Sequence, residues 1–300
     1  MKGDKFMDFF DSLLEEQYGF DLASKVKDGL SQDRVLSFRV NRIKSNRDEI
    51  ESVLNDNQIE FQGVSWYKDA FIVDNKEKEK IQGLDIYNEG KIYFQSLSSM
   101  IPPLVLDPKE GENILDMAAA PGSKTTQIAA ICDNKCFITA CEKNKIRADR
   151  LKYNIEKQGV KNTYVMSVDS RNLDDMFSFD KILLDAPCSG SGTININDEN
   201  LNKKFNQELI ERSSKLQVTL LNKAINLLKP GHEMIYSTCS ILKKENEEII
   251  ERVLKTGKVE LVPIELGKEV PRLPVKIDGT ICVMPNKYYE GFFVAKLRKI

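Results

Sequence analysis

The chain has 300 residues and a formal net charge of -2, with 41% hydrophobic and 30% charged residues. This length suits one large mixed-class domain with a smaller companion, and about three quarters of the surface of the unfolded chain can be buried. Residues 1–10 lack the continuous apolar run of a secretory signal. No segment approaches the roughly twenty apolar residues that cross a bilayer. These features predict a soluble, cytoplasmic protein.

The six cysteines are expected to be mostly free thiols, because no secretory signal accompanies them and a core of this size needs no disulfide bonds. Three of them lie close together, at Cys132, Cys136 and Cys141. Their spacing contains no CxxC pair, and the chain has a single histidine, His232. A zinc site is therefore disfavoured.

The overall charge does not indicate nucleic-acid binding, because the pI is about 5.8, whereas such domains usually exceed a pI of about 9. RNA would have to bind a local basic patch. One candidate patch comprises Arg34, Arg39, Arg42, Lys44 and Arg47. Charge alone favours an ordinary solvated face for these residues.

The first part of the chain is predicted to be a small α+β domain, residues 1–94. It begins with an amphipathic helix in which Phe6, Phe10 and Leu14 follow helical spacing. A strand at 36–40, a helix capped by Ser45 or Asn46, and short strands near 61–66 and 70–73 follow. The charged run 76–80 is expected to be a solvated turn.

After Pro102-Pro103, which are expected to break the chain, short apolar strands alternate with longer helical patterns. Strands are predicted at 113–117, 137–141, 164–168, 181–184, 234–237 and 291–297. Helices are predicted from residue 124, over 144–158, over about 209–228 ending at Pro230-Gly231, and over about 244–255. This alternation is typical of a largely parallel sheet flanked by helices. Residues 95–300 are therefore predicted to be an α/β domain.

A loop of small residues follows the first strand of this domain: Ala118, Ala119, Ala120, Pro121, Gly122 and Ser123, before Lys124. Small residues let a ligand approach the backbone at a helix N-terminus. Ligands of open α/β sheets bind beyond the carboxyl ends of the strands. The loop matches neither the Walker pattern GxxxxGK[ST] nor the dinucleotide pattern GxGxxG, which disfavours both of these phosphate-binding functions.

Three acidic residues follow successive strands: Glu142, Asp169 and Asp185. Each alone would more often cap a helix or face solvent, but together they favour a ligand site. Glu142 can accept hydrogen bonds from both ribose hydroxyls of a nucleoside. Three carboxylates suit a cationic nucleoside without phosphates, such as S-adenosylmethionine.

Two cysteines follow the fourth and fifth strands, in Pro187-Cys188 and Thr238-Cys239. Either cysteine alone could be a small buried hydrophobic residue, but both thiols should emerge at the edge that carries the cofactor loop. A thiolate can add to carbon-6 of cytosine, activate carbon-5 for methylation and leave afterwards. By chemistry alone, either thiol could attack.

With these motifs, the chain resembles the Nol/Nop/Sun family of RNA cytosine-5 methyltransferases. The matching stretches are Gln95–Met100, Asn113–Thr126, Glu142–Gly159, Phe179–Thr193, Lys229–Ser240 and Gly291–Lys299. Arg39-Val40-Asn41 also resembles the N-terminal element of the family. The resemblance implies a Rossmann-like, seven-stranded class I methyltransferase sheet over 95–300, and RNA guidance by residues 1–94.

The resemblance also implies roles for single residues. Cys239 would be the nucleophile and Cys188 would assist breakdown of the covalent RNA adduct, while Lys124 and Asp185 would hold the target base. The S-adenosylmethionine site would comprise Ala118, Ala119, Ala120, Pro121, Gly122, Ser123, Lys124, Glu142, Arg147, Asp169 and Asp185. Family members often have cysteine at position 118. Because this loop is expected to offer its backbone to the cofactor, the alanine at position 118 does not argue against activity.

The expected activity is therefore methyl transfer from S-adenosylmethionine to carbon-5 of a cytosine in tRNA or rRNA. Methylation of another base or nucleic acid by the same fold is one alternative. Another is an RNA-binding assembly factor that needs no turnover, although intact Lys124, Asp185, Cys188 and Cys239 weigh against it. The sequence indicates no membrane and no obligate protein partner.

Overall fold

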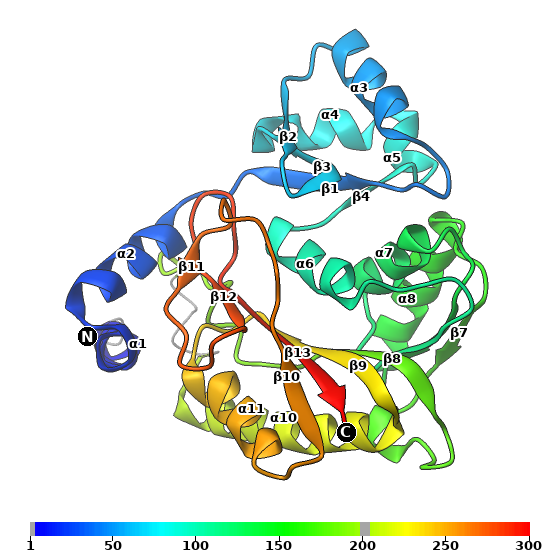
Figure 1. Ribbon diagram of the computed structural model, residues 1–300. Coiled ribbons are helices and arrows are strands. Elements are labelled where there is room, and N and C mark those ends of the chain that lie inside the picture. Colours follow the sequence, from blue (N-terminus) through cyan, green and yellow to red (C-terminus); the bar gives the residue numbers. More distant parts are fainter. Residues whose placement is uncertain (1–3, 199–204) are drawn as a thin grey trace.

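The computed structural model describes residues 4–198 and 205–300, and it contains two β-sheets with helices around them (Figure 1). The larger sheet has nine strands and the smaller has four within these ranges. In Figure 1 the small sheet lies above the large one, and helix α6 (Leu97–Leu106) follows the strand that leaves it.

The large sheet is built around five parallel strands in the order β7-β6-β5-β8-β9. Their bounds are Asn113–Asp116 for β5, Phe137–Cys141 for β6, Thr163–Met166 for β7, Phe179–Asp185 for β8 and Leu228–Thr238 for β9. Strand β13 (Phe292–Lys299) pairs antiparallel with β9, and β10 (Val259–Val262) pairs antiparallel with β13. These seven strands form the predicted Rossmann-like sheet. The short strands β11 (Arg272–Leu273) and β12 (Ile281–Val283) extend it beside β13.

Alternating side chains of the central strands bury both faces of this sheet. On β8, Ile182 and Leu184 belong to one hydrophobic cluster and Leu183 belongs to the other. The first cluster includes side chains of α10 (Gln207–Leu227) and α11 (Glu247–Leu254). The second includes side chains of α6 and of α7 (Ser123–Ile131). Helix α8 (Lys145–Lys157) follows β6, and its Leu151 packs with Ala140 of that strand. The strand ends are thereby held by a core on each face.

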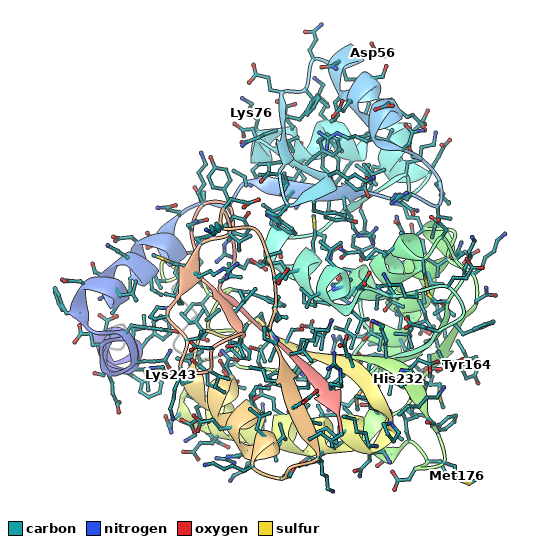
Figure 2. The ribbon with its side chains drawn as sticks, viewed as in Figure 1. Asp56, Lys76, Tyr164, Met176, His232 and Lys243 are labelled. Atoms are coloured by element: carbon teal, nitrogen blue, oxygen red, sulfur yellow. A yellow bond between two sulfur atoms is a disulfide. The ribbon has the colours of Figure 1, made fainter. Side chains whose placement is uncertain are left out.

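The N-terminal helices precede the small sheet in the chain but pack on the large one. Helix α1 (Asp4–Tyr18) and helix α2 (Phe20–Ser31) place Phe10, Leu14 and Val26 in the core cluster that contains Tyr236 of β9. Lys243 lies next to the end of α1 (Figure 2), where its ammonium group donates to the carbonyl of Gln17 at 3.0 Å.

The small sheet has the order β2-β3-β1-β4 and a hydrophobic core of its own. The strands are β1 (Leu36–Val40), β2 (Phe61–Val64), β3 (Tyr67–Val73) and β4 (Ile92–Phe94). The helices are α3 (Arg47–Asp56), η1 (Asn75–Glu77), α4 (Lys78–Gln82) and α5 (Asp85–Asn88). Asn46 caps α3 by accepting from the backbone N–H of Glu49, as the sequence pattern predicts. The domain boundary at residue 94 stays a prediction.

Three local expectations were wrong. Pro102 and Pro103 lie inside α6 and do not break it. Pro103 has no N–H to offer the carbonyl of Ser99, and that carbonyl accepts instead from the side-chain amide of Gln95 at 3.0 Å. The charged run 76–80 lies in η1 and α4, where Asp74 caps the first turn. Strand β9 begins at Leu228 and continues through Pro230-Gly231, beside a register shift in its pairing with β8.

Cys132 and Cys136 form a disulfide, whereas the sequence predicted mostly free thiols. Cys141, Cys188, Cys239 and Cys282 are free. Among the described residues, no group of three or more potential ligands is arranged to hold a metal ion. No helix of the described ranges is long and apolar enough to cross a membrane.

Arg39 of β1 connects the small sheet to the large domain. Its guanidinium group is fully buried and donates to Gln95 Oε1 at 2.8 Å, to Thr126 Oγ1 at 2.8 Å and to the carbonyl of Ser123 at 3.1 Å. Burial lowers the pKa of Arg39 to about 10, so the group stays charged at neutral pH. One nitrogen, Nη1, is buried without a hydrogen-bond partner.

The predicted basic patch around Arg39 is not a surface of unpaired cations. Arg39 lies in the interior, which contradicts its expected place on a solvated face or an RNA-binding patch. The others have partners within the chain: Glu290 for Arg34, Asp69 for Arg42, the carbonyls of Glu89 and Lys157 for Lys44, and Glu51 for Arg47.

Asp116, the last residue of β5, is a second buried charge. Thr125 donates to its Oδ2 at 2.7 Å, and its Oδ1 is buried without a hydrogen-bond partner. The pKa of Asp116 is raised from 3.8 to about 6, mainly by burial, with a smaller contribution from the charge of Asp185, while the hydrogen bond from Thr125 opposes the shift.

We predict that Arg39→Ala lowers the free energy of unfolding by about 3 kcal/mol, because it leaves several buried partners of a charged donor unsatisfied. Lys76→Ala is the control, since Lys76 has a side chain 73% exposed and pairs only with the exposed Asp74. This change should cost less than about 1 kcal/mol. Urea denaturation measures both. Equal losses for the two variants would contradict the connecting role of Arg39.

The raised pKa of Asp116 predicts a pH-dependent stability. Between about pH 4 and pH 6 the folded state holds a proton that the unfolded state releases, so the free energy of unfolding falls as pH rises through this window. The fall should reach about 2 to 3 kcal/mol. Asp116→Asn should remove it, whereas Thr125→Val should extend it to higher pH. Denaturation curves across this range test the prediction, and parallel profiles for all three proteins would refute it.

Candidate active site

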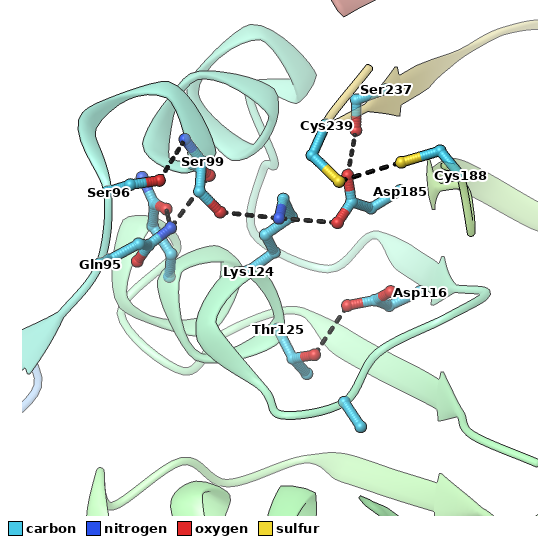
Figure 3. A network of polar contacts seen from close by, with 12 residues as sticks. Gln95, Ser96, Ser99, Asp116, Lys124, Thr125, Asp185, Cys188, Ser237 and Cys239 are labelled. Atoms are coloured by element: carbon cyan, nitrogen blue, oxygen red, sulfur yellow. Dashed lines mark hydrogen bonds and ion pairs between the residues drawn. The ribbon is translucent and has the colours of Figure 1, made fainter. Parts of the chain in front are cut away.

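The carboxyl ends of β5, β8 and β9 bring the predicted site residues to one edge of the large sheet (Figure 3). Cys188 follows β8 in a loop that we call the Pro-Cys loop, residues 187–193. Cys239 follows β9 in the Thr-Cys loop, residues 238–242. The two sulfur atoms lie 2.9 Å apart, and both side chains are partly buried. The structure therefore brings the two thiols together as the strand order predicts.

A chain of polar contacts crosses the edge beside the sulfurs (Figure 3). Lys124 Nζ lies 2.7 Å from Asp185 Oδ2 and donates to Ser99 Oγ at 2.7 Å. Ser237 Oγ donates to Asp185 Oδ1 at 2.7 Å. Burial lowers the pKa of Lys124, but the neighbouring Asp185 outweighs burial, and the net shift is upward. Lys124 is thus held as a cation, 5.5 Å from the centre of the Phe292 ring.

A pocket opens along the same edge toward β6 and β7. It is lined by Met117, Ala118, Glu142, Lys143, Arg147, Val168, Asp169, Ser170, Pro187, Leu216 and Leu220. It thereby unites one residue of the small-residue loop with Glu142, Arg147 and Asp169, four predicted cofactor residues. Its apolar lining, which includes Leu216 and Leu220 of α10, was not anticipated. The sequence predicted only a helix over about 209–228 for this segment.

The acidic residues of this pocket are held in place by local contacts. Glu142 is 4% exposed; its Oε1 accepts from the N–H of Asn144 at 2.9 Å and its Oε2 lies 3.2 Å from Arg147. Arg147 also donates to the carbonyl of Ala120 at 2.8 Å, which connects α8 to the loop. Asp169 caps the turn η2 (Ser170–Asn172), and hydrogen bonds from Arg171 hold its pKa below the usual range.

The backbone at the start of the small-residue loop is hydrogen-bonded to both strands that flank β5. The N–H of Met117 donates to Leu183 on β8 and the N–H of Ala119 donates to Cys141 on β6. Gly122 has φ +106°, and a Cβ there would lie 2.9 Å from Leu151 Cδ1, so glycine is required. Ala119, Ala120, Gly122 and Ser123 belong to this loop but do not line the pocket, and Pro121 lines a separate groove. Their roles stay predictions.

The sequence reasoning missed Glu245 at this edge, and it also missed two serines. Glu245, in the turn η3 (Lys243–Glu245), is fully buried and its carboxylate accepts from Ser189 and Ser240, which follow the two cysteines. The sequence contains no clear signal for it, because the surrounding charged residues indicate a solvated helix start. Ser99 and Ser237 were missed for a similar reason.

Comparisons with known proteins agree with this geometry. A family model described as 16S rRNA methyltransferase RsmB/F matches residues 103–298. A protein of Vibrio vulnificus named ribosomal RNA small subunit methyltransferase F is 39% identical over 194 residues, which are 63% of this chain and 41% of that protein. The chain thus spans about two fifths of the length of the first curated relatives that it matches.

Two solved structures extend the likeness to nearly the whole chain. A methyltransferase homolog protein from Pyrococcus horikoshii is 34% identical, with a TM-score of 0.85 over 96% of this chain and 94% of that one. NSun6 from Pyrococcus horikoshii, solved with SFG, has a TM-score of 0.87 at 24% identity, over 97% of each chain, and shows the likeness of fold. The expected fold and family are both confirmed, and the chain belongs to the 16S rRNA methyltransferase RsmB/F family, of the Nol/Nop/Sun type.

Proposed function

We propose that the protein is an S-adenosylmethionine-dependent RNA cytosine-5 methyltransferase that acts through a covalent cysteine adduct. The observation that carries this proposal is the pair of sulfurs, 2.9 Å apart, beside the Lys124–Asp185 ion pair. Membership of a methyltransferase family supports the reaction class. The names of the family and of the relatives favour ribosomal RNA as the substrate, with transfer RNA as the other candidate.

The pocket residues fit S-adenosylmethionine. In the proposed complex Glu142 accepts from the ribose hydroxyls and Asp169 approaches the adenine, beside the apolar Val168 and Leu220; the shared lining of one pocket supports this assignment. Asp116 Oδ1, buried without a partner at the end of β5, adds negative potential at the edge that would receive the sulfonium group. When bound, the cofactor supplies an electrophilic methyl group.

The residues around the two sulfurs suit methylation of cytosine at carbon-5. We expect the target base to be extruded from its stack into the site. Cys239 Sγ forms a bond to carbon-6, the electron pair of the 5,6 double bond moves to carbon-5, and carbon-5 takes the methyl group. A base then removes the carbon-5 proton and the sulfur–carbon bond breaks. In this proposal Asp185 holds the base by hydrogen bonds during the addition, and its contacts with Lys124 and Ser237, which fix the carboxylate, support that role.

The electrostatics favour unequal roles for the two cysteines. The hydrogen bond with Cys239 and burial raise the pKa of Cys188 well above its ordinary value. Cys188 therefore keeps its proton, and its S–H can donate to Cys239 Sγ. Lys124 remains a cation at the same edge, because burial lowers its pKa but the charge of Asp185 outweighs burial. This supports Cys239 as the nucleophile and Cys188 as the proton-bearing partner in adduct breakdown.

The single histidine of the chain, His232, offers no alternative base near the cysteines. His232 lies near the start of β9, whereas Cys239 follows its end (Figure 2). Its Nδ1 contacts the carbonyl of Asp180 at 3.0 Å. Proton transfers in the proposed reaction are therefore assigned to the thiols, the carboxylate of Asp185 and water.

A groove beside the cofactor loop supports RNA binding. Its walls come from the small sheet and from α8: Tyr87, Ile92, Tyr93, Phe94, Pro121, Arg150, Asn154, Lys157 and Gln158. Lys157 Nζ lies 4.0 Å from the centre of the Tyr87 ring. Within the described ranges, neither Arg150 nor Lys157 has a carboxylate partner in an ion pair. Aromatic rings and unpaired cations together suit the bases and phosphates of single-stranded RNA.

Covalent trapping tests the proposed function. Each variant is incubated with RNA and S-adenosylmethionine, and denaturation-resistant protein–RNA adducts are measured together with 5-methylcytosine by mass spectrometry. Cys188→Ala should accumulate the adduct because breakdown is slowed. Cys239→Ala should form no adduct and should lose at least about 1000-fold in rate, the scale expected for loss of a covalent nucleophile.

Three outcomes would contradict the assignment. Adduct with Cys239→Ala and none with Cys188→Ala would reverse the two roles. Methylated uridine without methylated cytosine would exclude cytosine-5 chemistry. Full cellular function with Cys239→Ala would favour an assembly factor that needs no turnover.

Charge reversal in the groove tests RNA binding separately. Arg150→Glu and Lys157→Glu should each weaken RNA affinity about tenfold at moderate salt and reduce the salt slope of binding by about one, as for a lost phosphate contact. Lys152→Glu is the control, because Lys152 lies on the same helix outside the groove. Fluorescence anisotropy with a single-stranded RNA measures all three, and equal effects would exclude the groove.

A further inference from the structure

One buried carboxylate connects the two cysteine loops. The Oε1 atom of Glu245 accepts from the backbone N–H of Ser189 at 2.7 Å, and its Oε2 accepts from the hydroxyls of Ser189 and Ser240, each at 2.6 Å. Ser189 directly follows Cys188 and Ser240 directly follows Cys239. Glu245 is 0% exposed. A single carboxylate thus binds the residues that directly follow both thiols, Ser189 through its N–H and hydroxyl and Ser240 through its hydroxyl.

Glu245 is itself fixed by its surroundings. Tyr236 of β9 donates from its hydroxyl to the carbonyl of Glu245 at 2.6 Å. Gln217 of α10 donates to the carbonyl of Pro187 at 3.0 Å and lies 3.5 Å from Glu245 Oε1. The side-chain amide of Asn246 donates to the carbonyl of Ser240 at 2.9 Å. Glu245 therefore connects both loops to a strand through its backbone carbonyl and to a helix of the core through its carboxylate.

The two cysteine loops also contact each other directly. The hydroxyls of Ser191 and Ser240 lie 2.8 Å apart, and the N–H of Gly192 donates to the carbonyl of Cys239 at 3.0 Å. A Cβ on Gly192 would lie 2.0 Å from the carbonyl oxygen of Gly291. Because the two loops contact each other directly and Gly192 has no room beside Gly291, we expect a change at Glu245 to displace the sulfurs.

We propose that Glu245 is a positioning residue that holds the Pro-Cys loop against the Thr-Cys loop and so sets the approach of the Cys188 and Cys239 sulfurs. Its meaning for catalysis rests on the function proposed above. The contacts themselves do not, so thiol chemistry can test the positioning in the absence of RNA.

The charge and the hydrogen bonds of Glu245 can be separated by substitution. The negative charge of Glu245 is among the causes that raise the pKa of Cys188, after the hydrogen bond with Cys239 and burial. A glutamine in its place can accept from the N–H of Ser189 and donate to both serine hydroxyls, because a hydroxyl either donates or accepts. Glu245→Gln therefore removes the charge and keeps the connection, whereas Glu245→Ala removes both.

The first experiment measures how readily the two sulfurs meet. The purified full chain is oxidised with diamide, which takes two electrons and two protons from the thiols, and the Cys188–Cys239 disulfide is quantified by peptide mass spectrometry. The disulfide should form about tenfold more slowly in Glu245→Ala, because a displacement of about 1 Å costs up to ~100-fold in a proximity-dependent reaction. Glu245→Gln should recover most of the rate.

Two further variants serve as a matched control and as a substitute if Glu245→Ala does not fold. Glu247→Gln is the matched control, because this nearby glutamate is 4% exposed and its carboxylate accepts from the N–H of Lys276; its rate should equal that of the native chain. Ser240→Ala keeps the carboxylate but removes its bond to the Thr-Cys loop, and it should slow the reaction even if Glu245→Ala does not fold. Native rates in both Glu245→Ala and Ser240→Ala would overturn the proposal.

The second experiment detects the charge. In a Cys239→Ala background, Glu245→Gln should raise the rate of alkylation of Cys188 by iodoacetamide about threefold at pH 8, because a nearby negative charge no longer opposes the thiolate. A purely structural contact would leave this rate unchanged, and an unchanged rate would overturn the electrostatic part of the proposal. If RNA adducts never form while both thiol experiments succeed, the positioning stands and the proposed reaction fails.

Discussion

The Lys124–Asp185 ion pair holds together the edge of the sheet on which the site is built. A lysine whose side chain is only 10% exposed loses most of its hydration, and the carboxylate at 2.7 Å offsets that loss. Lys124 belongs to the helix after β5, Asp185 ends β8, and Ser237 on β9 bonds the same carboxylate. Three neighbouring strands are thereby connected at their carboxyl ends by one charged group and its partners.

This connection divides the edge into two compartments. Toward β6 and β7 lies the pocket with Glu142, Arg147 and Asp169, which suits a nucleoside. Toward β9 lie the two sulfurs and the carboxylate of Glu245. An electrophile held on one side and a base held on the other would meet beside Asp185, so the same contact that stabilises the fold also lies where the two proposed substrates react.

The sequence predicts this arrangement where strand periodicity and chain order decide the outcome. Cys188 and Cys239 meet because parallel strands end at one edge, and the short apolar run at 181–184 predicts the strand that precedes Cys188. Arg39 was misplaced because a charged residue on a strand is normally solvated, and its burial depends on partners in α7. Glu245 was missed because hydrogen bonds across 56 residues leave no local pattern. The prolines in α6 were misread because a side chain elsewhere satisfies the freed carbonyl.

The end of α1 has a consequence for the order in which the site can form during synthesis. Gln17 and Tyr18 donate to the carbonyl of Ile241, and the N–H of Lys243 donates to Gln17, across 223 to 226 residues. A ribosome exposes α1 long before the Thr-Cys loop that it contacts. Until the segment containing Ile241 and Lys243 has emerged, these groups of α1 lack their partners, and a nascent chain cannot complete the loop that carries Cys239. Assembly of the thiol pair is therefore a late event, and shorter nascent chains should lack it.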